Sequence, residues 1–204
     1  MSIKVRKVSK EFARDYLGRI ASIRIDVFRE FPYIYNGSLD YEVTYLKRYF
    51  DAENSAFILA FDESISQTYD QQIVGVATCL PLIEEDEFIK ETFIQNNCKC
   101  EDYFYFGESV LLPEYRGQGI GHLFFDEREK YALSFPQIKN TTFCAVEREL
   151  NHPLKPLKYR DLTSFWSARG YALSDDLRSE FEWLDLGQST ETKKTMKYWV
   201  KKWK

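Results

Sequence analysis

The sequence predicts a single α/β (α+β) domain in which strands and helices are interspersed along the chain. Runs of strand length that are apolar, or that alternate between apolar and polar residues, recur from residue 3 to residue 200. Segments with apolar residues every three or four positions separate these runs and predict helices. A glycine-rich turn also joins one strand directly to a helix. No internal repeat, low-complexity stretch or linker divides residues 1–204, so we expect one domain.

The first quarter of the chain predicts a strand followed by two helices. Residues 3–8 alternate like a short strand. Residues 10–31 carry apolar side chains at helical spacing until Pro32 closes the pattern. Ser38 is a suitable N-cap for a second helix that continues through Phe50.

The middle of the chain predicts a hairpin, a short helix and a further strand. Residues 56–61 and 73–80 read as two strands joined by a long polar tip. The helix expected over residues 84–97 begins with the acidic run 84–87, which favours a helix N-terminus. The same acidic run could attract a cationic amine if it faces a cleft. Residues 103–112 then form an apolar and aromatic strand that leads into the glycine-rich turn.

After the turn and its helix, the remaining segments predict a strand over 141–146, a helix over 156–169 and final strands over 180–184 and 194–200. The aromatic side chains of the last strand could pair with another subunit as easily as fold onto the chain's own core, so a homodimer stays open. The lysines between residues 193 and 204 read as the solvated side of this strand.

The composition narrows the classes of partner and location. A net charge of −4 and a pI near 5.4 argue against general nucleic-acid binding. No apolar run approaches the roughly 20 residues of a membrane helix, and the N-terminus lacks the apolar region of a signal peptide. We therefore expect a cytoplasmic protein without a membrane partner. Aromatic residues make up 17% of the chain, which predicts a core rich in Phe and Tyr.

The four cysteines do not predict a metal site or a disulfide framework. Only Cys98 and Cys100 are close in sequence, and no second pair lies at zinc-ligand spacing. Cys79 and Cys144 lie in strand-like apolar segments and read as small core residues. We expect no metal, and a surface redox pair at Cys98 and Cys100 is the alternative.

Residues 108–131, ESVLLPEYRGQGIGHLFFDEREKY, hold the most informative pattern. Glycines at 117, 119 and 121 let the backbone turn sharply with its N–H groups pointing one way, and the following helix adds the positive end of its dipole. Such a turn binds an anion, and a pyrophosphate suits it well. It is not a P-loop, because no Lys-Ser or Lys-Thr follows, and its GxGxG spacing departs from the GxGxxG dinucleotide fingerprint.

The pattern that does fit is [Q/R]-x-x-G-x-[G/A], met by Arg116, Gly119 and Gly121. It resembles motif A of the GNAT superfamily of N-acetyltransferases, which bind the pyrophosphate of acetyl-CoA in this way. Residues 165–171, FWSARGY, resemble the family's FYxxxGF signature at the end of the next helix. The resemblance implies a mixed, mostly antiparallel twisted sheet of about seven strands, flanked by helices. It also implies that this sheet splays at the acetyl-CoA site between strands 103–112 and 141–146.

The resemblance implies that acetyl-CoA is the cosubstrate and that backbone groups do most of the binding. Strand residues should meet the pantetheine arm, and the turn should supply N–H groups to the pyrophosphate. The N–H of Leu111 should also stabilise the oxyanion. The residues expected at acetyl-CoA are Val110, Leu111, Leu112, Arg116, Gly117, Gln118, Gly119, Ile120, Gly121 and His122.

Acetyl transfer to the primary amine of a small molecule or peptide needs a base for the amine. Glu108 and Glu147 are the carboxylates nearest the expected cleft. Gly107 marks a strand bulge that re-aims its neighbour Glu108. Glu108 paired structurally with an Arg or Tyr is the alternative interpretation.

The family's usual acid is less certain, because Trp166 stands where a tyrosine commonly protonates the leaving thiolate, and indole cannot donate that proton. Tyr159 is the first substitute, at the place of an asparagine that is frequent in the family, and Tyr105 is the second. The missing acid favours an alternative function, a non-catalytic module that binds or senses acyl-CoA.

Overall fold

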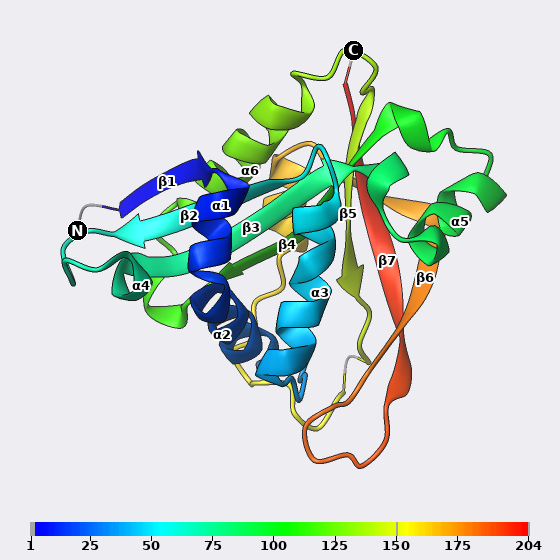
Figure 1. The fold of residues 1–204 in the computed structure, drawn as a ribbon. Helices are drawn as coiled ribbons and strands as arrows, with labels where there is room; N and C mark the ends of the chain where they lie inside the picture. The colour runs from blue at the N-terminus through cyan, green and yellow to red at the C-terminus, as the bar shows by residue number, and fades with distance from the viewer. Residues whose placement is uncertain (1–2, 150, 204) are drawn as a thin grey trace.

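The computed structural model describes residues 3–149 and 151–203, so the two ends of the predicted domain, including the last lysine of the C-terminal run, lie outside it. All seven strands form one sheet in the order β1-β2-β3-β4-β5-β7-β6 (Figure 1). Among the strands of the described residues, only β4 and β5 run parallel, and every other neighbouring pair is antiparallel. The sheet is therefore mixed and mostly antiparallel, as the resemblance implied.

The strands are β1 Ile3–Val8, β2 Ala56–Asp62, β3 Ile73–Pro81, β4 Tyr103–Leu111, β5 Asn140–Val146, β6 Ala172–Trp183 and β7 Thr192–Lys202. The α-helices are α1 Lys10–Asp15, α2 Leu17–Phe28, α3 Leu39–Asp51, α4 Tyr69–Gln72, α5 Glu87–Gln95, α6 Ile120–Ala132 and α7 Thr163–Ala168. The predicted strands 3–8, 56–61, 73–80, 103–112 and 141–146 are confirmed to within a residue or so at their ends.

Helices cover both faces of the sheet. The helices α2 and α3 pack on one face, where α2 contacts β3 and β4, and α6 lies behind the sheet against β1 to β4 (Figure 1). Aromatic side chains fill both interiors, as the composition predicted. Tyr49, Phe57 and Phe61 are buried on the α1–α3 face, and Phe104 and Phe106 on the α6 face.

The N-terminal helices differ from the sequence prediction in one respect. The single helix expected over residues 10–31 is wrong, because Tyr16 leaves the helical conformation (φ −112°, ψ 21°) and separates α1 from α2. The second of these helices ends at Phe28. The predicted cap of α3 is confirmed, since the Ser38 hydroxyl accepts a hydrogen bond from the N–H of Tyr41 at 3.3 Å.

The C-terminal third differs more. The helix predicted over 156–169 is wrong in its first half, because only Thr163–Ala168 is α-helical and residues 151–162 form turns and bends. The N–H groups of Lys155 and Tyr159 donate to carbonyls three residues earlier, each at 3.0 Å, in separate turns, and Asp161 accepts from the N–H of Thr163 at 2.9 Å where α7 begins. The predicted strand 180–184 is too short, since β6 begins at Ala172.

The last strand β7 lies between β5 and β6, so its aromatic residues Tyr198 and Trp199 are buried in the chain's own sheet. The lysines of β7 are not simply a solvated face. Lys194 is only 5% exposed, and its ammonium donates to the carbonyl of Trp183 at 2.7 Å. A homodimer stays a prediction.

Cys79 and Cys144 are buried, which confirms them as core residues, and all four cysteines are free thiols. Among residues 3–149 and 151–203, no group of three or more His, Cys, Asp or Glu side chains is arranged to hold a metal ion. Over the same residues, no helix has the length and apolar character needed to cross a bilayer.

Candidate active site

The sheet opens between β4 and β5. These strands are in register only from Tyr103 to Tyr105, which lie opposite residues 140–142, and no pairing joins the described residues beyond that point. Further along β4, the register with β3 shifts so that Gly107 and Glu108 together face Thr78. This is the bulge that Gly107 predicted. A Cβ added at Gly107 would lie 2.0 Å from the Tyr49 hydroxyl, so a side chain cannot fit there without displacing that ring.

The glycine-rich turn has the backbone conformation that its sequence predicts. Gly117 and Gly119 have φ values of 75° and 84°, in the left-handed region, and Gly119 is the N-cap of α6. No side chain caps this helix. The N–H groups of Gly119, Ile120 and Gly121 donate to no atom of the described chain, whereas that of His122 reaches the Gly119 carbonyl at 2.9 Å. Free N–H groups at a helix N-terminus form an anion site.

Two side chains lie beside this turn. Arg116 donates from Nε to the Leu111 carbonyl at 3.0 Å, and its Nη1 lies 2.6 Å from a carboxylate oxygen of Glu30. These contacts fix the turn to the end of β4. The exposed ring of His122 packs edge-on against Phe165, with 4.8 Å between ring centres.

The N–H of Leu111 is directed into the gap. The next N–H, that of Leu112, donates to Val74 of β3 at 3.1 Å. Successive N–H groups of a strand point to opposite sides, so that of Leu111 points away from β3 and toward β5.

A cavity of about 460 Å³ occupies the gap on the face covered by α6 and α7. Its walls include Phe106, Phe125 and Phe143, together with the predicted residues Glu147 and Tyr159. Val110, Leu111 and Leu112 do not line this cavity, although Glu108 and Ser109 immediately before them do.

Trp166 forms a packed wall of this cavity. Its ring lies 5.1 Å from that of Phe143 and 5.2 Å from that of Trp199, measured between ring centres. The position that commonly holds the family's acid is therefore occupied here by a packing residue.

A second cavity of about 110 Å³ lies on the α1–α3 face. It is lined mostly by aromatic rings, namely Phe28, Tyr33, Tyr35, Tyr41, Tyr45, Tyr105, Phe181 and Trp183. The residues that line both cavities are Phe28, Tyr33, Gly107, Glu108 and Cys144. The gap between β4 and β5 is thus a window through the sheet, and the bulge residues form part of its frame.

Glu108 lies in this window and meets a buried arginine. Its Oε2 is 2.6 Å from Nη1 of Arg24, whose Nε donates a hydrogen bond to Glu42. All three side chains are at most 5% exposed. Burial alone would lower the pKa of Arg24, but the charges of Glu108 and Glu42 raise it above its ordinary value, so Arg24 stays charged.

The contact between Arg24 and Glu108 has ion-pair distance without hydrogen-bond geometry. Both carboxylate oxygens of Glu108 lack a hydrogen-bond donor among the described residues. A buried carboxylate normally satisfies its oxygens, and leaving them open is costly. Among the described residues, the closest polar group to this carboxylate that the structure pairs with it is the Arg24 guanidinium.

The other predicted catalytic residues lie at the mouth of the larger cavity. The Tyr159 ring packs edge-on against Phe31, with 4.7 Å between ring centres. Burial, and after it the charge of Asp161, raises the pKa of the Tyr159 hydroxyl, so it keeps its proton through neutral pH. Glu147 is exposed and forms an ion pair with Lys197.

Tyr105 and Cys144 lie at the edge of the window, where Tyr105 lines the smaller cavity and Cys144 lines both. The Tyr105 hydroxyl lies 3.1 Å from Sγ of Cys144. Burial raises the pKa of Cys144 to about 12, so its thiol stays neutral at physiological pH.

The acidic run 84–87 lies in neither cavity. Glu84 accepts hydrogen bonds from the backbone and side chain of Asn54, at 2.9 and 2.6 Å. Arg48 lies within 3.3 Å of Glu85 and 2.6 Å of Asp86. The helix predicted over 84–97 is shorter, since α5 spans Glu87–Gln95 with Asp86 as its N-cap. Only Asp86 and Glu87 therefore lie at a helix N-terminus, and Glu84 and Glu85 precede it.

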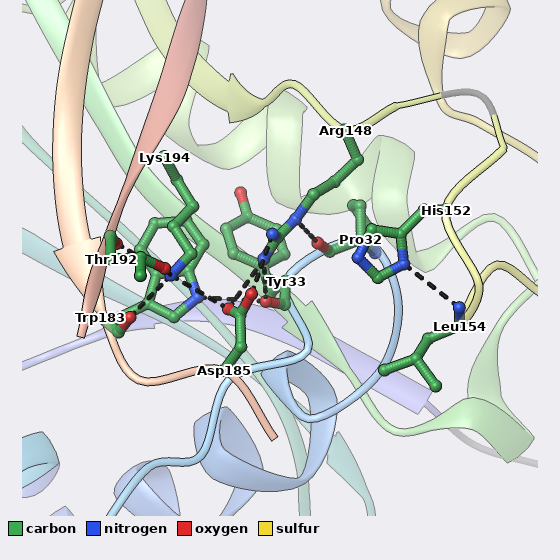
Figure 2. A network of polar contacts seen from close by, with 9 residues as sticks. All are labelled: Pro32, Tyr33, Arg148, His152, Leu154, Trp183, Asp185, Thr192 and Lys194. Carbon is green, nitrogen blue, oxygen red and sulfur yellow. Dashed lines mark hydrogen bonds and ion pairs between the residues drawn. The ribbon is translucent and has the colours of Figure 1, made fainter. Parts of the chain in front are cut away.

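A network of polar contacts borders the site and was not predicted from the sequence (Figure 2). Arg148 donates to both oxygens of Asp185, at 3.0 and 2.9 Å, and to the carbonyls of Pro32 and Tyr33, each at 2.8 Å. Lys194 approaches the same carboxylate at 3.2 Å. The network joins the end of β5 to the α2–α3 connection and to the β6–β7 connection. We refer to Arg148, Asp185 and Lys194 as the clamp.

The sequence contains a pattern that indicates the buried ion pairs. Arg24 lies among Ile20, Ile23 and Val27 on the apolar stripe of its helix. Glu42 likewise stands on the stripe that Leu46 continues. A charged residue at a stripe position of each of two neighbouring helices predicts a buried pair.

The family comparison agrees with this geometry. The model of the acetyltransferase (GNAT) family matches residues 20–158, which include the window and the glycine-rich turn. No curated protein matches the sequence significantly. Solved structures with the same fold include Arabidopsis thaliana NAA60 in complex with a bisubstrate analogue, at 15% identity and a TM-score of 0.64, covering 100% of both chains.

A putative acetyltransferase from Acinetobacter baylyi gives 12% identity and a TM-score of 0.64, covering 99% of this chain and 92% of the other. PH1933 from Pyrococcus horikoshii gives 15% identity and a TM-score of 0.61, covering 100% of this chain and 99% of the other. At such identities these structures show the fold alone. The family model matches more than half of the chain, and the sheet splays between β4 and β5 just before the glycine-rich turn with its free N–H groups. This protein is therefore a member of the acetyltransferase (GNAT) family.

Proposed function

We propose that this acetyltransferase transfers the acetyl group of acetyl-CoA directly to a primary amine of a small molecule or peptide, with both substrates bound at once. The observation that carries the proposal is the position of Glu108. Its buried carboxylate lines both cavities and has oxygens without hydrogen-bond donors among the described residues. A base placed in the window can reach an amine on one face while the acetyl group is held on the other.

The residues present fit acetyl-CoA, whose thioester would supply an activated acetyl group. We expect the N–H groups of residues 118–121, which have no partner among the described residues, to bind the pyrophosphate, with Gly117 allowing the approach of the backbone; the N–H of His122 is already bonded to the Gly119 carbonyl. Arg116 holds the turn against β4. Residues 110–112 would lie along the pantetheine arm. The N–H of Leu111 is directed into the gap, where it can stabilise negative charge on the acetyl oxygen.

Glu108 is the better base of the two predicted carboxylates. Glu147 lies at the mouth of the larger cavity and is engaged by Lys197. Glu108 is buried in the window, where a proton taken from the amine stays out of bulk water. We assign to Glu147 a role in the approach of substrates, and to Glu108 the role of the base that accepts the proton of the amine.

Tyr159 is the proposed acid. It is the tyrosine of the larger cavity that keeps its proton through neutral pH and lies outside the packed core. Trp166, packed between Phe143 and Trp199, supports the alternative of a module that binds acyl-CoA without turnover. The open oxygens of Glu108 favour the enzyme, because a binding module has no use for an unsatisfied buried base.

The test is release of free CoA from acetyl-CoA across polyamines, amino acids, aminoglycosides and short peptides, with calorimetric binding of acetyl-CoA measured in parallel. Turnover on any of these classes would establish the acceptor chemistry. Binding without turnover on every class would favour the sensor. Absence of acetyl-CoA binding would contradict the assignment of the turn.

A further inference from the structure

The small cavity on the α1–α3 face restricts the kind of amine that can reach Glu108. We propose that the acceptor is a primary ammonium at the end of an unbranched alkyl chain, which enters this cavity and places its nitrogen beside Glu108. The inference rests on the proposed function for the acetyl transfer itself. Recognition of the ammonium is a separate property and can be measured without turnover.

The size of the cavity gives the first restriction. Its volume of about 110 Å³ is smaller than the roughly 150 Å³ of an engineered cavity that accommodates benzene. At roughly 30 Å³ for each water-sized group, it holds about four such groups. An ammonium with two or three methylenes fits this space. A sugar ring, or an α-amino group whose carbon carries both a side chain and a carbonyl, does not.

The walls give the second restriction. Eight of the lining side chains are aromatic, and five of those eight are tyrosines, so the faces that meet the ligand carry negative charge density. Methylenes pack well on such rings, and cations are attracted to them. The cavity already shows this behaviour with its own cation, because the Arg24 guanidinium lies 4.3 Å from the ring centre of Tyr45 and 5.0 Å from that of Phe28.

Charge balance gives the third restriction. Inside the small cavity the positive charge of Arg24 faces the two negative charges of Glu42 and Glu108. Among these three side chains negative charge is in excess by one, and no described residue donates a hydrogen bond to the Glu108 carboxylate. The fourth charged residue of the lining, Glu182, is exposed and adds a further negative charge at the entrance. An entering ammonium would neutralise the interior and donate to Glu108.

The larger cavity does not share this preference. Its lining holds four basic side chains, Arg128, Arg148, Lys155 and Lys197. Apart from Glu108, which both cavities share, it holds three acidic ones, Glu147, Glu149 and Asp161, so its own side chains carry one excess positive charge. A cation is thus directed to the α1–α3 face, opposite the glycine-rich turn, and the two substrates do not compete for one space.

The binding test uses n-butylamine as the probe and calorimetry without acetyl-CoA. Glu42→Gln keeps the shape of the side chain but leaves the interior neutral, and should weaken n-butylamine binding at least tenfold. Tyr41→Leu removes an aromatic ring that is 50% exposed at the rim, and should weaken binding about two- to fivefold. Tyr69→Leu is the matched control, because Tyr69 is 43% exposed in α4 and lines neither cavity. Its affinity should equal that of the parent protein.

The turnover test compares n-butylamine, 1,4-diaminobutane and Nα-acetyl-lysine methylamide with alaninamide and glucosamine. The three alkyl amines should have kcat/KM at least tenfold above the other two. The ratio between the diamine and the lysine derivative identifies the source, a free amine or a side chain of a peptide.

The two tests separate the inference from the proposed function. Preference for alaninamide or glucosamine, or n-butylamine binding that ignores both Glu42→Gln and Tyr41→Leu, would overturn the inference while acetyl transfer stood. Binding of n-butylamine with the expected losses, but without acetylation of any amine, would support the inference and refute the proposed function.

Discussion

Gly107 shows how one missing side chain shapes the site. The Tyr49 hydroxyl occupies the space that a Cβ would need, and the bulge at this residue directs Glu108 toward Arg24. The glycine and its bulge could be predicted from the sequence. The partners of Glu108 could not, because Arg24 and Glu42 lie on helices 84 and 66 residues earlier in the chain, and no local pattern encodes which distant charges will meet.

Gly119→Trp should abolish acetyl-CoA binding measured by calorimetry. The indole would project into the space beside the free N–H groups, where an added Cβ meets no described atom within 4 Å. The left-handed φ of 84° should also destabilise the fold by about 1–2 kcal/mol. Gly187→Trp is the matched control, with a φ of 80° and equal free space in the β6–β7 connection. It should lose the same stability and keep full affinity, and retained affinity in Gly119→Trp would refute the assignment of the turn.

Glu108→Gln should lower kcat/KM for the amine by about 10²–10⁴-fold, because the proton acceptor is lost. Affinity for acetyl-CoA should be unchanged, since the turn is untouched. Glu147→Gln serves as the comparison and should change kcat/KM by less than tenfold. Equal losses in both variants would show that the two carboxylates share the role, and an unchanged rate in Glu108→Gln would return Glu108 to a structural one.

Tyr159→Phe should lower kcat and leave the affinity for acetyl-CoA unchanged. Burial and the nearby Asp161 raise the pKa of the hydroxyl above its ordinary range, so the proton is lost only at higher pH than in a free tyrosine. The parent enzyme should therefore show no alkaline decline from this group below pH 10. Steady-state rates from pH 6 to 10 provide the measurement, and a variant as fast as the parent protein would exclude Tyr159 as the acid.

At the scale of the elements, local signals predicted most strands and the cap of α3 but failed where distant contacts decide. The apolar spacing across Tyr16 continues without interruption, yet α1 and α2 separate there. Residues 156–162 have helical spacing in part, but they form a turn and a bend, and only Thr163–Ala168 is helical. Side chains such as Arg148 satisfy backbone carbonyls of another segment, and sequence periodicity gives no information about that.

The clamp gives a prediction for stability. Burial would raise the pKa of Asp185, but the hydrogen bonds and charges of Arg148, and after them those of Lys194, lower it overall. A carboxyl whose pKa is lower in the folded chain stabilises the fold fully above its unfolded pKa of about 3.9, and this contribution is lost as the pH falls further. Asp185→Asn should therefore lower the free energy of unfolding at pH 7 by about 3 kcal/mol.

Urea unfolding of Asp185→Asn at several pH values provides the measurement. The difference from the parent protein should narrow below about pH 4 as Asp185 becomes protonated. The exposed Asp175→Asn is the control, with an expected change within about 0.5 kcal/mol. A difference that persists unchanged into acid would show that the charge of Asp185 contributes nothing.

At the scale of the whole molecule, the site has one part on each face of the sheet. Acetyl-CoA is expected on the face of α6, and the acceptor on the face of α1–α3 (Figure 1). The fold and the glycine-rich turn could be predicted because their signals are local and ordered along the chain. The two-sided character of the site could not, since it depends on how far β4 and β5 separate after Tyr105, and that follows from packing on both faces at once.

The early end of the β4–β5 pairing has a consequence for deuterium exchange. Amides that face the gap, such as that of Leu111, lack a strand partner and should exchange quickly in the free protein. Acetyl-CoA lying along β4 should slow them, and amides that pair β2 with β3 should be unaffected. Exchange followed by mass spectrometry would show whether a ligand completes the hydrogen-bond ladder of β4. In that case the sheet acquires its missing strand from a molecule that is released after each reaction.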